Sequence, residues 1–111
     1  MKYKTFFLLM GTFLLAAPPD WQDDPGCCVH SAWIIAGIVQ YNDVNIAETG
    51  DMFAAFDVDG NVRGVAVQLI APFGPYQDQP FYEMTMRSNT SGEHLSFKYY
   101  DASEDAVLDI I

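Results

Sequence analysis

The fold is decided by the stretch Gly50-Asp51-Met52-Phe53-Ala54-Ala55-Phe56-Asp57-Val58-Asp59-Gly60-Asn61-Val62-Arg63-Gly64-Val65-Ala66. It consists of two apolar runs that flank the pair Asp59-Gly60. An Asp-Gly pair in this setting is a strong hairpin signal, because a type I′ turn requires positive φ at both central residues. We therefore predict a β-hairpin over residues 50–66, closed at Asp59-Gly60. This closure places Arg63 opposite Phe56 and Asp51 opposite Gln68.

Further strands are predicted on both sides of this hairpin. Before it, residues 29–41 form an apolar, β-branched run that indicates a strand buried on much of both faces, with a short helix as the alternative, and residues 44–47 indicate a short edge strand. After it, three prolines and a glycine make residues 71–80 a loop. Residues 81–88, 94–100 and 106–111 then read as strands. In the second of these, alternation points Leu95, Phe97 and Tyr99 inward and Tyr100 outward.

This pattern of short strands and turns is typical of an all-β protein, and no helix of ordinary length is indicated. We predict a small antiparallel β-sandwich, immunoglobulin-like, over residues 29–111. The sequence stops within an apolar strand, so we expect that the chain is truncated or that further modules follow.

The N-terminus has the pattern of a secretory signal peptide. Lys2 and Lys4 precede an apolar run over residues 6–15, and Ala16-Ala17 offers small residues for cleavage. The run is shorter than the ~20 residues of a transmembrane helix. We predict a signal peptide over residues 1–17, a flexible leader over 18–28, secretion to the extracellular space or cell surface, and no transmembrane span after signal removal. The alternative is an uncleaved N-terminal anchor.

The charge of the remaining chain restricts its partners. After removal of the signal peptide, Arg63, Arg87 and Lys98 stand against fifteen acidic residues. Nucleic acids and anionic membranes require Lys or Arg to neutralise phosphate, so both are disfavoured. We expect other extracellular proteins or glycans as partners.

The two cysteines, Cys27 and Cys28, are adjacent. Neighbouring Cα atoms lie only about 3.8 Å apart, which is shorter than in an ordinary disulfide. Two free thiols, a vicinal disulfide and links to other chains are the three interpretations, and we expect no ordinary staple within the domain.

Several segments in order resemble a known module: Gly-Asp-Met-Phe-Ala-Ala-Phe and Gly-Asn-Val-Arg-Gly-Val-Ala, then Phe-Tyr-Glu-Met-Thr-Met, then Ser-Gly-Glu-His-Leu-Ser-Phe-Lys-Tyr-Tyr-Asp-Ala. Together they resemble a β-sandwich module that is repeated in large exported and cell-surface microbial proteins. The resemblance covers residues 29–111. It implies a non-catalytic extracellular module.

Five residues of the hairpin region are predicted to have structural roles: Asp51, Asp59, Gly60, Arg63 and Gly64. We expect Arg63 to point inward and to donate hydrogen bonds to loop carbonyls, and Gly64 to mark a bulge or a close backbone approach. The segment of residues 57–61 superficially resembles a calcium loop. Its ligand positions fail the EF-hand pattern, so we expect a turn, no metal site and no cofactor.

A binding site and a modification site are also candidates. Phe73, Tyr76, Asp78, Gln79 and Tyr100 could together bind carbohydrate by stacking and hydrogen bonding. The interpretation that we favour is that Phe73 and Tyr76 instead cap the open end of the sandwich as core. In addition, residues 89–91 form an N-glycosylation sequon at Asn89.

Catalysis has little support, because neither His30 nor His94 lies in a nucleophile or metal motif. We therefore expect a non-catalytic structural or adhesion module that is not an enzyme. A carbohydrate-binding module is the alternative.

Overall fold

The structure is a computed structural model that describes residues 18–111, so the predicted signal peptide over residues 1–17 lies outside the described residues. The described chain is all β, as the sequence predicted, and within it no helix is long and apolar enough to cross a membrane. Its strands are β2 (His30–Gly37), β3 (Gln40–Tyr41), β4 (Val44–Asn45), β5 (Met52–Phe56), β6 (Val62–Val65), β7 (Val67–Ile70), β8 (Pro80–Ser88), β9 (Ser96–Asp101) and β10 (Ala106–Ile110).

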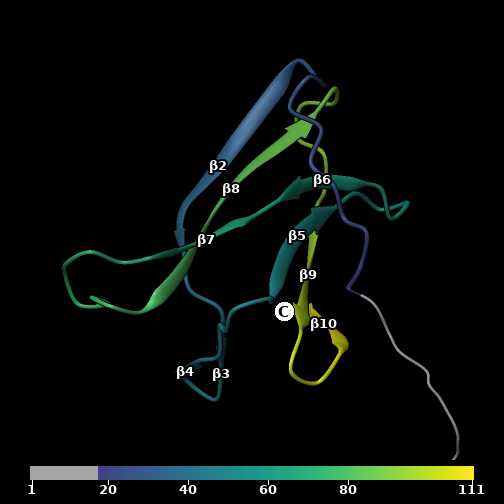
Figure 1. Cartoon of the computed structure of the whole chain (residues 1–111). Helices are drawn as coiled ribbons and strands as arrows, with labels where there is room; N and C mark the ends of the chain where they lie inside the picture. The colour runs from purple at the N-terminus through teal and green to yellow at the C-terminus, as the bar shows by residue number, and fades with distance from the viewer. Residues whose placement is uncertain (1–17) are drawn as a thin grey trace, which may run out of the picture.

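The strands form small antiparallel sheets (Figure 1). One sheet has the order β10-β9-β5-β6, and a second has the order β2-β8-β7. The strands β3 and β4 form a separate two-stranded hairpin. The chain passes from the first sheet to the second at Ala66, whose N–H still donates to the Phe53 carbonyl in β5 (2.8 Å). One nearly continuous segment, β6–β7, therefore belongs to both sheets.

The predicted hairpin is present as β5–β6, but its turn differs from the prediction. Ala54 pairs with Val65, and the pairing then shifts by one residue. Gly60 has a φ of 85°, whereas Asp59 is outside the left-handed region, so the turn is not type I′. The backbone of Asp57 pairs instead with that of Asn61, giving a three-residue loop that ends in a left-handed glycine.

The one-residue shift also changes the predicted cross-strand partners. Phe56 pairs with Val62, and Arg63 is the additional residue at the irregularity. The prediction that Arg63 lies opposite Phe56 is therefore wrong. Gln68 is in β7 and pairs with Tyr82 of the second sheet, so the prediction that it lies opposite Asp51 is also wrong.

The core lies where the inner faces of the two sheets meet. Its buried side chains come from β5, β8 and β9: Phe53, Ala55, Tyr82, Met84 and Tyr99. Gly64 allows this contact, because a Cβ atom there would lie 2.5 Å from the Thr85 carbonyl oxygen of β8. The backbones of β6 and β8 thus approach each other without an intervening side chain.

The first long strand differs most from its prediction. Residues 29–41 do not form one buried strand: β2 ends at Gly37, and β3 belongs to the separate hairpin. Within the described sheets β2 pairs only with β8, so it is an edge strand and most of its residues are exposed. On its outer face, Trp33 and Ile35 stay largely in contact with solvent, and of residues 18–28 Asp23 lies beside them.

Candidate functional site

The carboxylate of Asp51 is the centre of a buried hydrogen-bond chain. It accepts from the Ala102 and Glu48 backbone N–H groups (2.9 and 3.0 Å) and from the Tyr99 hydroxyl (2.6 Å). Because the single hydroxyl proton of Tyr99 goes to Asp51, the Tyr82 hydroxyl donates to Tyr99 (2.9 Å). Burial, followed by the hydrogen bond to Asp51, raises the pKa of Tyr99. These hydrogen bonds connect β8 and β9 to the turns before β5 and after β9, so their role is structural.

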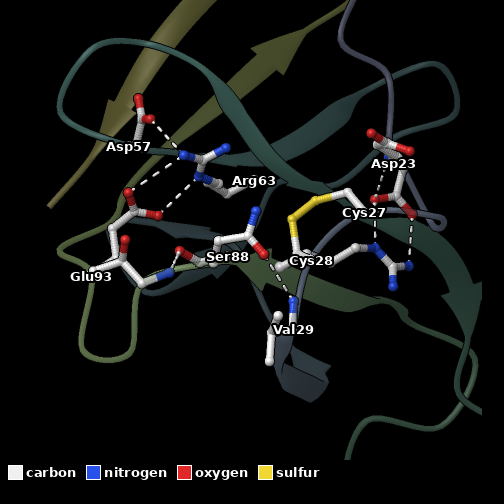
Figure 2. The surroundings of a disulfide bond; sticks show 12 residues. Asp23, Cys27, Cys28, Val29, Asp57, Arg63, Ser88 and Glu93 are labelled. Carbon is white, nitrogen blue, oxygen red and sulfur yellow. Dashed lines mark hydrogen bonds and ion pairs between the residues drawn. A yellow bond between two sulfur atoms is a disulfide. The ribbon is translucent and has the colours of Figure 1, made fainter.

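A second cluster surrounds Arg63 (Figure 2). Its guanidinium donates to Asp57 (2.9 Å) and, through Nε, to Glu93 (2.9 Å). The prediction that Arg63 binds loop carbonyls is wrong, because two carboxylates are its partners. Hydrogen bonds from Asn61, together with the Arg63 charge, lower the pKa of Asp57, and the hydrogen bond from Arg63 lowers the pKa of Glu93.

This arrangement also explains why the segment of residues 57–61 resembles a calcium loop. The Asp57 carboxylate accepts hydrogen bonds from the backbone of Asp59 and from the backbone and side chain of Asn61, and Arg63 contacts it as well. Its lone pairs are therefore used by donors of the same chain. No group of three or more His, Cys, Asp or Glu side chains with the geometry of a metal site occurs within residues 18–111.

Cys27 and Cys28 are joined in a vicinal disulfide, at the point where residues 18–28 meet β2 (Figure 2). Cys28 has a φ of 82°, in the left-handed region. On the N-terminal side of the disulfide, Asp23 forms a two-point ion pair with Arg87 of β8. Further back, the ring of Trp21 packs edge-on against Phe56, 5.2 Å between centroids. Residues 18–28 thus contact both sheets.

The five residues of the predicted carbohydrate site do not come together. Phe73 and Tyr76 lie in the loop between β7 and β8, and they are 78% and 46% exposed, so the prediction that they cap the core is wrong. Asp78 is exposed and Gln79 half-buried in the same loop. The loop projects away from β9 in Figure 1.

Tyr100 is the member that the fold separates from this loop. It lies on the side of β9 opposite the core residue Tyr99, as the alternation predicted, but it is only 5% exposed. Its hydroxyl donates to Asp105 in the turn between β9 and β10 (2.7 Å), and this turn covers the outer side of β9. The hydrogen bond to Asp105 raises the pKa of Tyr100.

Asn89 lies in the exposed turn after β8. Its side-chain Oδ1 accepts a hydrogen bond from the Val29 N–H (3.0 Å).

A further feature that sequence reasoning missed is a group of exposed apolar side chains on the second sheet, which we call the outer face. It consists of Trp33 and Ile35 of β2 and Val67 of β7, which are 68%, 75% and 59% exposed. Trp33 pairs with Thr85 and Val67 with Glu83, and the three apolar side chains border one shallow hollow over β8 that is also lined by Asp23, Glu83 and Thr85. Trp33, Ile34 and Ile35 form a continuous apolar run, which by itself predicts a strand buried on both faces and gives no sign that one face is exposed.

Comparison with protein-family models, with curated proteins and with solved structures gives no match for this chain. The functional argument therefore rests on the surfaces described above.

Proposed function

We propose that this chain is a secreted, non-catalytic module of the immunoglobulin-like sandwich type, and that its outer face binds another extracellular protein. The observation that carries the proposal is the exposure of Trp33, Ile35 and Val67 on one sheet face. Adjacent exposed apolar residues on one face mark interaction sites, and tryptophan is among the residues that contribute most to protein interfaces.

Three further observations support the proposal. The two buried carboxylates, Asp51 and Asp57, are each saturated by donors from the same chain and serve the fold. Both histidines lie on the exposed surface. The tripartite pattern of residues 1–17 supports secretion, which would bring the outer face into contact with extracellular partners.

The test is binding of the fluorescently labelled chain to the surface of the cells that produce it. The double variant Trp33→Ser/Ile35→Ser removes the apolar part of the outer face without touching the core. We expect it to bind at least about thirtyfold more weakly, the effect of losing a binding hot spot. Val58→Ser is the matched control, because Val58 is 79% exposed in the β5–β6 loop, away from the outer face. Equal binding by the double variant and the wild type would refute the proposal.

A glycan-binding function is the second candidate, and the exposure of Phe73 and Tyr76 is the observation that favours it. Aromatic faces in an exposed loop can stack on sugar rings. In the same assay, loss of binding in Phe73→Ala/Tyr76→Ala, together with competition by free oligosaccharide, would identify this function instead.

A further inference from the structure

An apolar cleft of about 580 Å³ lies at the open side of the two sheets, away from the outer face. It is bordered by the C-terminal half of β2, the β3–β4 hairpin and β10. Its apolar lining includes Ile34, Val39, Ile46, Phe53, Leu108 and Ile110. Leu108 pairs with Tyr99, so its side chain lies on the core side of the first sheet, yet it remains 42% exposed. Leu108 is therefore only partly covered, whereas Ile110, on the same face of β10, packs against the core.

Two free strand edges flank this cleft. In the described sheets β2 pairs only with β8, and β10 pairs only with β9. The other edge of each strand presents backbone N–H and C=O groups that are not used in a ladder. The cleft follows the chain from Leu108 in β10 to Ile111, and on its other side from Gly37 to Tyr41. An extended peptide fits both features, because its backbone can pair with a strand edge while alternate side chains enter an apolar groove.

Charge determines what kind of peptide fits. All three cationic side chains in residues 18–111 are already in ion pairs: Arg63 with Asp57 and Glu93, Arg87 with Asp23, and Lys98 with Asp109. The chain has a large excess of carboxylates, and no described residue that lines the cleft is a Lys, Arg or His. A second copy would bring the same negative charge and be repelled. A segment with Lys or Arg at its ends would be attracted.

We propose that this cleft binds an extended, alternately apolar segment of a partner protein with basic residues at its ends, which pairs with the free edge of β10. The site is separate from the outer face, so it can hold even if the proposed function of that face fails.

The test uses the chain as it is expressed and the synthetic peptide Lys-Lys-Ile-Thr-Val-Thr-Ile-Lys-Lys. Binding is measured by titration, and hydrogen exchange of the β10 amides is followed by NMR. Leu108→Lys places a charge in the cleft, whereas Val107→Lys places the same charge on the opposite face of β10 and is the matched control. We expect saturable binding that Leu108→Lys weakens at least about tenfold and Val107→Lys less than about twofold. Free β10 amides should become protected when the peptide binds.

Two further probes isolate the two components of the recognition. A peptide with proline at alternate positions cannot form the ladder and should not bind. A peptide with Glu in place of Lys should bind more weakly than the basic peptide. If Leu108→Lys does not fold, Leu108→Ser tests the same contact, because it removes the apolar side chain from the cleft without adding a charge and should also weaken binding of the peptide.

Four outcomes would overturn the proposal. They are no binding of the basic peptide, equal binding by Leu108→Lys and the wild type, equal binding of the proline peptide, and protection of the β10 amides by dimerisation without peptide. The last result would identify a second copy as the occupant.

Discussion

Replacing Gly64 by alanine tests whether the close approach of β6 to β8 holds the two sheets together. The added Cβ would lie 2.5 Å from the Thr85 carbonyl oxygen and 3.1 Å from the sulfur of Met84. Ordinary contacts of a Cβ begin at about 3.4 Å, so the backbone oxygen overlaps by almost 1 Å. Met84 is flexible and can move, but the carbonyl belongs to the central strand of the second sheet. The sheets must therefore separate, and core contacts weaken.

The size of the effect follows from two opposing contributions. Overpacking of a core typically costs about 1–3 kcal/mol. Alanine in a strand without obstruction would instead gain about 0.5–1 kcal/mol over glycine. Because the obstruction here is backbone, we expect Gly64→Ala to lower the free energy of unfolding by about 2 kcal/mol. For a domain of this size, that corresponds to a decrease in Tm of roughly 8–16 °C.

The assay is urea unfolding monitored by tryptophan fluorescence, with thermal unfolding as a second measurement. Gly60→Ala is the control for a purely conformational effect, because Gly60 has a φ of 85° and open space around it. The left-handed conformation should cost that variant about 1–2 kcal/mol without separating the sheets. Hydrogen exchange of the β8 core amides distinguishes the two variants. Only Gly64→Ala should accelerate this exchange by more than its loss of global stability accounts for. If Gly64→Ala is as stable as the wild type or more so, the packing argument is refuted.

Three other predictions concern the polar contacts and the disulfide. Tyr99→Phe removes one of the three donors to the buried Asp51 carboxylate and the acceptor of the Tyr82 hydroxyl proton, and should cost about 1–3 kcal/mol in urea unfolding. Tyr100→Phe, whose partner Asp105 is exposed, should cost less, and equal losses would contradict the role of the buried chain. The pKa values of the two carboxylates that bind Arg63 are lowered on folding, so their contribution to stability is present above the unfolded pKa near 4 and is lost as pH falls below it. Arg63→Met should therefore flatten the acid side of the stability profile, and an unchanged profile would contradict this. Finally, Cys27 and Cys28 should react with iodoacetamide only after reduction, as measured by intact mass, and alkylation without reductant would show that they are free thiols.

The sequence predicts the local features of this fold well. The apolar runs around Asp59-Gly60 locate the β5–β6 hairpin, and the pattern of residues 81–88 locates the strand β8. Both signals depend on neighbours in the chain, which is why they can be read directly. The turn type was wrong because Asp57 uses its own side chain to bind the backbone of the loop, which favours a longer turn than the Asp-Gly pair alone indicates.

The features that were mispredicted depend on distant segments. His30 of β2 pairs with Ser88, and this non-local pairing places the strand at an edge, so its apolar residues face solvent. Alternation in β9 pointed Tyr100 outward, but Asp105 binds it and the following turn covers it. The exposure of Phe73 depends likewise on how far the β7–β8 loop projects from the sheets. No pattern within a short window contains this information.

The passage of β6–β7 from one sheet to the other has a consequence for cooperativity. Each sheet includes part of this segment, so neither can lose its strand pairing without disturbing the other at Ala66. The two sheets should therefore unfold as a single unit rather than as separable subdomains. Under native conditions, the slowest-exchanging amides of β5 and β8, which lie in different sheets, should report the same opening free energy.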